Sequence, residues 1–146
     1  MLAETDKAYL AGLIDGEGCI TVVRRQPAAA HIRYTYQLQL TIVSSTVKLL
    51  RWIENRFGGK IDRIDNRHNH IWRWKCSVDE AATILRLCLP YLVLKRRQAI
   101  IALYFYEYCR MRSRWDAQSP LLALRERVYW CLRKLHTRKG RPAHAG

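Results

Sequence analysis

One stretch of the sequence decides the fold that we predict: Leu10-Ala11-Gly12-Leu13-Ile14-Asp15-Gly16-Glu17-Gly18. Its first half is apolar with helical spacing, and its second half sets two carboxylates between glycines. A helix that only filled a core would not contain Gly12, because glycine costs about 1 kcal/mol relative to alanine inside a helix. We therefore expect a helix that packs closely against another backbone and then delivers acids to a site.

The residues in front of this stretch extend the helix. Asp6 is expected to cap a helix that begins at Lys7. Ala8, Gly12 and Gly16 then lie four residues apart, on one face of that helix. Small residues at this spacing allow a second backbone to approach, so they predict a close helix–helix contact.

Two strands are predicted next, over residues 19–25 and 31–43. In the second of these, apolar residues alternate with polar ones, which gives the strand one apolar and one polar face. Such alternation indicates a sheet that is covered on one side only. The polar side carries Gln and Arg, which can each bond bidentately to a base edge in the major groove of DNA. An ordinary solvent-facing sheet is the other interpretation of this strand alone.

The rest of the sequence repeats the pattern. We predict a helix over 47–57, capped by Ser45 or Thr46, and strands over 60–65 and 71–76. Further helices are predicted over 77–89, where Ser77-Val78-Asp79-Glu80 indicates a capping box, from Lys95 to about 111, and over 121–135. In the third strand Ile61 and Ile64 imply opposite faces, so a β-bulge is expected there. The order predicts one α+β domain over residues 1–136, followed by a basic, flexible tail over 137–146.

Charge limits the partners. The chain has 26 Lys and Arg against 12 Asp and Glu, a net charge of +14, which calls for a polyanion or a membrane surface. No apolar run is long enough to cross a bilayer and no secretory signal pattern begins the chain, so we expect nucleic acid, and neither a membrane nor a small-molecule substrate. The 5 cysteines form no C-x-x-C pair, which favours a reducing, intracellular compartment, either bacterial cytoplasm or an organelle.

The opening stretch closely resembles the signature nonapeptide of the LAGLIDADG homing endonucleases. Two later segments are also similar to shared segments of that family: residues 44–61, with Ser44-Ser45-Thr46 and Phe57-Gly58-Gly59, and residues 90–99, with Lys95-Arg96-Arg97. The resemblance runs from about Lys7 to Tyr108. It implies an αββαββα LAGLIDADG core with an antiparallel sheet open on one face, here with extra C-terminal helices.

Members of this family with a single motif act as homodimers, and this chain has one motif. The resemblance therefore implies a dimer through the motif helices, with these interface residues: Ala8, Ala11, Gly12, Leu13 and Asp15. The implied function is that of an intron-type homing endonuclease. Such an enzyme hydrolyses both strands of double-stranded DNA at a long pseudo-palindromic site and leaves short 3′ overhangs.

The resemblance also assigns the active site. Glu17 occupies the position of the metal-binding acid, and Gly16 offers its carbonyl oxygen as a further ligand. The implied metal is Mg²⁺, with Mn²⁺ as a substitute and Ca²⁺ binding without cleavage. Lys95 falls on the basic residue near the active site, Thr46 on the polar position after the second strand, and Arg51 is a further catalytic candidate. Asp15 is expected to hold the helix end or the dimer contact.

Strand alternation selects the side chains that would contact DNA. They are Thr21, Val23, Arg25, Arg33, Thr35, Gln37, Gln39, Thr41, Arg63, Arg73 and Lys75. Two other functions stay open. One is a non-cleaving DNA- or RNA-binding protein of the same fold, a maturase or a regulator. The other is an RNA-binding sheet, which the sequence disfavours because the strand aromatics fall on the apolar side, away from a stacking face.

Overall fold

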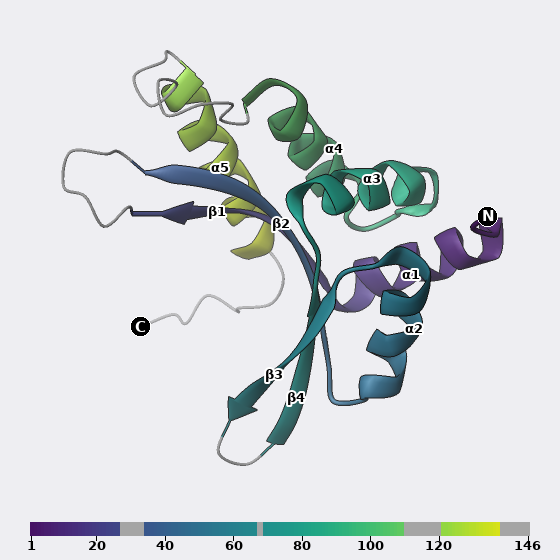
Figure 1. Ribbon diagram of the computed structural model, residues 1–146. Coiled ribbons are helices and arrows are strands. Elements are labelled where there is room, and N and C mark those ends of the chain that lie inside the picture. Colours follow the sequence, from purple (N-terminus) through teal and green to yellow (C-terminus); the bar gives the residue numbers. More distant parts are fainter. Residues whose placement is uncertain (27–33, 67–68, 110–120, 138–146) are drawn as a thin grey trace, which may run out of the picture.

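The computed structural model describes residues 1–26, 34–66, 69–109 and 121–137 (Figure 1). Along the chain its elements are α1 Glu4–Glu17, β1 Gly18–Arg25, β2 Thr35–Ser44, α2 Val47–Phe57, β3 Lys60–Asn66, β4 Asn69–Lys75, α3 Val78–Cys88, the 3₁₀ turn η1 Leu89–Tyr91, α4 Arg96–Tyr104, the π-helical turn η2 Phe105–Cys109 and α5 Leu121–Thr137. This order confirms the predicted αββαββα core with additional helices after it.

The four strands form one antiparallel sheet in the order β1-β2-β4-β3. Only the end of β2, from Thr41 to Ser44, pairs with β4. The two hairpins therefore meet at the centre of the sheet and diverge from there, and the helices gather on one side (Figure 1). The result is a saddle with one open face.

Alternation along the strands explains why one face is covered. Ile20, Leu40 and Ile42 are fully buried beneath the helices, together with Trp74 of β4. Their neighbours along β1 and β2, such as Thr21 and Thr41, point to the opposite side and are partly exposed. The prediction of a one-sided sheet is confirmed, since helices bury a single side-chain register of each strand.

Helix α5 extends the helical layer over the outer part of the β1–β2 hairpin (Figure 1). Its Glu126 accepts hydrogen bonds from Arg24, at 2.7 Å, and from the Tyr36 hydroxyl. The Arg24 guanidinium also lies over the Tyr129 ring, 4.8 Å from its centroid. These contacts fix α5 to the covered face. The tail expected from residue 137 lies outside the described residues, apart from Thr137, which ends the helix.

One predicted helix cap is wrong, and a second is right in position but lacks the side-chain bond. Helix α1 begins at Glu4 and has Ala3 at its N-cap, while Asp6 lies in the first turn, 3.4 Å from Arg56. Thr46 is the N-cap of α2 but its side chain makes no capping bond; instead its own N–H donates to the Ser44 hydroxyl. In the first turn of α1, Asp6 still interacts favourably with the positive end of the helix. The capping box that begins α3 at Ser77 is confirmed.

The bulge predicted in β3 is also wrong. The strand pairs with β4 residue by residue, with Ile61 opposite Trp74 and Ile64 opposite Ile71. Ile64 thus has an apolar partner on the open side, and a cross-strand pair of this kind stabilises a sheet without a covering helix. In this register Arg63 shares the covered side with Ile61 and Trp72. Arg63 is therefore on the opposite side from the other described residues that were predicted to contact DNA.

Two element boundaries also differ from the prediction. Strand β2 begins at Thr35, and residues 31–33 of the predicted strand lie outside the described residues. The helix expected to continue to residue 111 ends its α-helical part at Tyr104 and goes on as a π-helical turn to Cys109.

Candidate active site

The last turn of α1 holds two carboxylates that have different surroundings. Asp15 is only 9% exposed, and its two oxygens accept the backbone N–H groups of Val93 and Lys95, each at 2.8 Å. The side chain therefore fastens the segment between η1 and α4 to the end of α1. Of the two roles predicted for Asp15, the structure displays the one at the helix end.

Lys95 reinforces the same junction. Its side chain is only 7% exposed, and its ammonium donates to the carbonyl oxygens of Ile14, at 2.8 Å, and Gly18. The C-terminal end of a helix carries partial negative charge, so a cation is stabilised there even beside the Ile14 carbonyl, which also accepts the Gly18 N–H. Because these two carbonyls bracket Glu17 in the chain, Lys95 fixes the backbone that carries the predicted metal ligand.

The turn into β1 requires glycine at position 18. A Cβ atom there would lie 2.7 Å from the Cα atom of Ile14, much closer than real Cβ contacts. The glycine lets β1 start immediately against the end of α1. As a result the chain passes from helix to strand at Glu17 and Gly18 without an intervening loop.

Glu17 contrasts with Asp15. It is exposed, and across the described ranges no side chain forms a hydrogen bond or ion pair with its carboxylate. The adjacent Gly16 lies in the last helical turn, where its carbonyl has no N–H ahead of it in the helix. One free carboxylate and one carbonyl are oxygen ligands of the kind that Mg²⁺ takes together with several waters.

A single copy of the chain offers few metal ligands at this point. Within the described part of the chain, no three His, Cys, Asp or Glu side chains are grouped closely enough to hold a metal ion. The residues present therefore fit a weakly held cation that also needs ligands from outside this copy. A second Glu17 and DNA phosphates would be such ligands.

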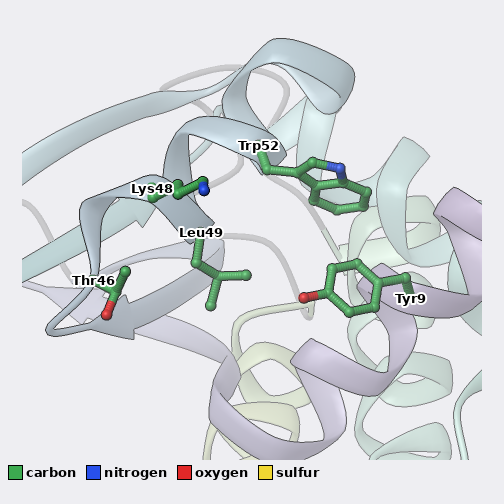
Figure 2. Close-up of a pocket in the computed structure, with 5 residues that line it drawn as sticks. All are labelled: Tyr9, Thr46, Lys48, Leu49 and Trp52. Carbon is green, nitrogen blue, oxygen red and sulfur yellow. The ribbon is translucent and has the colours of Figure 1, made fainter.

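The structure places Thr46 at the same end of the β1–β2 pair as Glu17, because Gly18 pairs with Ile42 and the chain turns into α2 just beyond it. Thr46 is exposed and, with Tyr9, Lys48, Leu49 and Trp52, lines an open groove between α1 and α2 (Figure 2). Arg51 is exposed on α2 and is not among the residues that line this groove. Glu17, Lys95 and Thr46 are thus brought to one region, and among the described residues no hydrogen bond or ion pair joins Arg51 to them.

Two features of this region escaped the sequence interpretation. Val93 and Leu94 are 80% and 61% exposed and lie directly before Lys95, and Tyr9 on α1 is 50% exposed. An apolar run from Leu92 to Leu94, in a stretch that is neither helix nor strand, could have indicated these exposed side chains. Val93 and Leu94 thus lie exposed beside the end of α1, where the Val93 N–H bonds Asp15, and Tyr9 lies against Trp52 of α2.

The second missed feature is His136, which α5 brings towards the start of β1. Burial is the largest cause that lowers the pKa of His136, and the charge of Lys95 lowers it further, although a hydrogen bond with the Ile20 backbone opposes this. The imidazole is therefore mainly neutral at pH 7. Its Nε2 atom is buried and has no partner within the described residues. Nothing in the sequence indicated that α5 would end near Lys95.

The open face of the sheet gathers the other predicted residues. Cross-strand pairs place Thr21 opposite Gln39, Val23 opposite Gln37, and Arg25 opposite Thr35, while Thr41 lies opposite Lys75 of β4. Arg73 lies on the same side of β4 as Lys75, two residues along the strand. Arg33 lies outside the described residues. Apart from Arg33 and Arg63, all residues predicted to contact DNA share this face.

Asp15→Ala is expected to destabilise the fold by about 2 kcal/mol or more, because two buried N–H groups lose their acceptors. The free energy of unfolding, measured in urea, tests this. Glu17→Ala is the matched control: that carboxylate is exposed and two residues away, so its loss should change stability by about 0.5 kcal/mol or less. Equal stability of the two variants would contradict the role given to Asp15.

Comparisons with known proteins agree with this geometry. A family model described as LAGLIDADG endonuclease matches residues 10–108. The chain therefore belongs to the LAGLIDADG endonuclease family. A search of curated protein sequences returned no match.

Solved structures show the same fold. The homing endonuclease I-CvuI, in complex with the I-CreI target, superposes with a TM-score of 0.77 at 24% identity, over 95% of this chain and 87% of that one. The archaeal intron-encoded homing endonuclease I-Vdi141I, complexed with DNA, gives a TM-score of 0.76 at 15% identity, over 97% and 89% of the two chains. I-SmaMI bound to cleaved DNA matches with a TM-score of 0.70 at 14% identity, over 85% of this chain and 42% of that one.

Within the described residues, no helix combines the length and apolar character that crossing a bilayer requires.

Proposed function

We propose that this protein is a Mg²⁺-dependent homing endonuclease that acts as a homodimer. It would hydrolyse both strands of a long, nearly palindromic DNA site and leave short 3′ overhangs. The observation that carries the proposal is the pair of carboxylates at the end of α1. Both oxygens of Asp15 accept hydrogen bonds from the backbone of the same chain, whereas Glu17, two residues later, is exposed and unpaired among the described residues.

The outer face of α1 supports the dimer. Ala8, Gly12 and Gly16 are exposed, and a Cβ atom added at Gly12 or Gly16 would meet nothing within 4 Å. A single copy thus gives no packing reason for these glycines, while a second α1 across a two-fold axis would use the space.

Exposed apolar side chains lie next to the end of α1. Val93 and Leu94 are among the most exposed large apolar side chains, and the Val93 N–H is bonded to Asp15 of α1; Leu13 of α1 is half-buried. The interface that we propose uses Ala8, Gly12 and Leu13, with Val93 and Leu94 added. Ala11 and Asp15 face inward and are buried in this copy, so they would support the interface from behind.

The comparison with a longer chain points the same way. This chain matches less than half of I-SmaMI, which leaves room in that protein for a second unit of similar size. In a homodimer, two copies of the present chain would supply both units. A two-fold dimer reads one half-site with each copy, so its target would be nearly palindromic.

In the active site, Glu17 and the Gly16 carbonyl of each copy would hold Mg²⁺. When bound, Mg²⁺ polarises a phosphate and lowers the pKa of its water. Lys95 would place positive charge beside the phosphate and holds the backbone of Glu17 in position. Thr46 and Arg51 would orient water and phosphate oxygens. Mn²⁺ should replace Mg²⁺, and Ca²⁺ should support binding without cleavage; I-CvuI itself was solved with DNA in the presence of Mg²⁺ and of Ca²⁺.

The open sheet face would contact the DNA. Its Gln and Arg side chains can read base edges in the major groove, and the net charge of +14 favours a polyanion. The contacting residues that we propose are Thr21, Val23, Arg25, Thr35, Gln37, Gln39, Thr41, Arg73 and Lys75, with Arg33 from the undescribed segment.

A plasmid assay tests the proposal. The substrate is supercoiled DNA that carries the two sequences flanking the inserted gene for this chain, joined directly to each other without the insertion. We expect linear product with Mg²⁺ or Mn²⁺, and a bound but uncut complex with Ca²⁺. Binding without cleavage in both Mg²⁺ and Mn²⁺ would contradict the endonuclease proposal and favour a maturase or regulator of the same fold.

A further inference from the structure

An acidic side chain lies within the otherwise basic half of the open sheet face. Asp62 of β3 pairs in register with Arg73 of β4, on the same side as Lys75. Across the described part of this face, Asp62 is the one acidic residue. A carboxylate here weakens the attraction of the surface for phosphates, since that attraction scales with the number of cations available to the DNA. Its presence therefore needs a different reason.

The geometry around Asp62 is that of a clamp. The Nε and Nη2 atoms of Arg73 donate to its two oxygens, at 3.0 and 2.6 Å, in a bidentate fork. The ammonium of Lys75 donates to Oδ2 at 2.8 Å. One carboxylate thus holds both cations of β4, and all three side chains stay partly exposed.

The clamp leaves donors free for DNA. A guanidinium has five N–H donors and an ammonium has three, so both cations keep unused donors when they bind Asp62. Without the clamp, each long side chain would have to lose its rotamer freedom on binding, and preorganisation avoids that loss. Lys60 lies directly opposite Lys75, an unfavourable like-charge pair that Asp62 also offsets.

We propose that Asp62 is a positioning residue for sequence recognition: it holds Arg73 and Lys75 for base edges in each half-site and withholds them from phosphates. This inference rests on the proposed function, because it takes the open sheet face as the DNA-contacting surface. Arg or Lys reading the O6 and N7 acceptors of guanine is the commonest specific contact in the major groove. The hairpin that carries the clamp extends away from the helices (Figure 1), so its open side is accessible to a duplex.

The clamp stays charged under assay conditions. Hydrogen bonds from Arg73, followed by those from Lys75, lower the pKa of Asp62 to about 2. Asp62 therefore remains ionised at any pH near neutrality. Replacement by the isosteric amide removes the charge while keeping the shape of the side chain.

The test compares Asp62→Asn with Glu107→Gln. Both variants gain one unit of positive charge, but Glu107 pairs with Arg86 among the helices, away from the open face. Binding to the specific site and to an unrelated duplex is measured in Ca²⁺ over a range of salt concentrations. For Asp62→Asn we expect the ratio of specific to nonspecific affinity to fall by about tenfold or more, and the salt dependence to steepen by about one to two phosphate contacts. Glu107→Gln should leave both quantities as in the wild type.

A second variant, Arg73→Lys, keeps the charge but cannot form the fork. It should lose its preference at one base-pair position of each half-site, measured with single-base variants of the target. If wild-type protein binds the specific DNA but Asp62→Asn keeps the wild-type affinity ratio and salt dependence, the positioning role is overturned and the endonuclease proposal is untouched. If the wild-type protein shows no DNA binding, both proposals fall.

Discussion

Glu17→Gln is expected to abolish cleavage of both DNA strands while DNA binding is retained. The amide keeps the size of the side chain but loses the charge that would hold Mg²⁺. A metal ion that polarises the phosphate contributes several kcal/mol to the transition state, so the cleavage rate should fall on the order of 1,000-fold or more. The fold should be unaffected, because the carboxylate is exposed and makes no bond within the described residues.

Two measurements separate the effects of this change. Single-turnover cleavage in Mg²⁺ should be lost, and the dissociation constant in Ca²⁺ should stay within a few-fold of the wild-type value. Glu4→Gln is the matched control, since Glu4 is an exposed acid at the other end of α1 that pairs with Lys7. It should cut normally. Unchanged cleavage by Glu17→Gln would remove the metal assignment.

The second large effect is expected at Gly12. Gly12→Gln should convert a dimer into a monomer, because a long side chain would occupy the space that the second α1 needs. The monomer itself has room for it, since a Cβ atom at Gly12 meets nothing within 4 Å, and helix propensity favours the change by up to about 1 kcal/mol. With only one half-site engaged at a time, affinity for the full DNA site should fall by about 100-fold or more.

Light scattering, circular dichroism and plasmid cleavage together test this variant. We expect half the wild-type mass, unchanged helix content and no linear product. Gly18→Ala supplies the contrast: its Cβ atom would lie 2.7 Å from Ile14 Cα, so it should damage the fold of each copy. A Gly12→Gln protein that remains dimeric and cuts both strands would contradict the proposed interface.

Features with a local chemical cause could be predicted from the sequence. Helix α2 has the predicted bounds of residues 47 and 57, because its apolar face and the Gly58-Gly59 turn are both local signals. The capping box at Ser77 is local as well. The open face of β2 followed from strict alternation between apolar and polar residues, which fixes the side of every side chain once the strand exists.

Features that depend on distant contacts could not be predicted. The bonds of Asp15 with Val93 and Lys95 join residues about 80 positions apart, and nothing near Asp15 in the sequence indicates them. The bonds of Asp62 with Arg73 and Lys75 depend on the register of β3 on β4. A bulge in β3, which was predicted, would have shifted that register. Arg63 was misplaced for the same reason.

Two copies of this chain are proposed to share a two-fold axis, so that the Glu17 of each copy acts on one of the two DNA strands. Sequencing of both DNA ends after cleavage in Mg²⁺ tests this central claim most directly. We predict one cut in each strand, placed symmetrically about the centre of a nearly palindromic sequence and leaving short 3′ overhangs. Cuts unrelated by two-fold symmetry, or a nick confined to one strand, would contradict the claim.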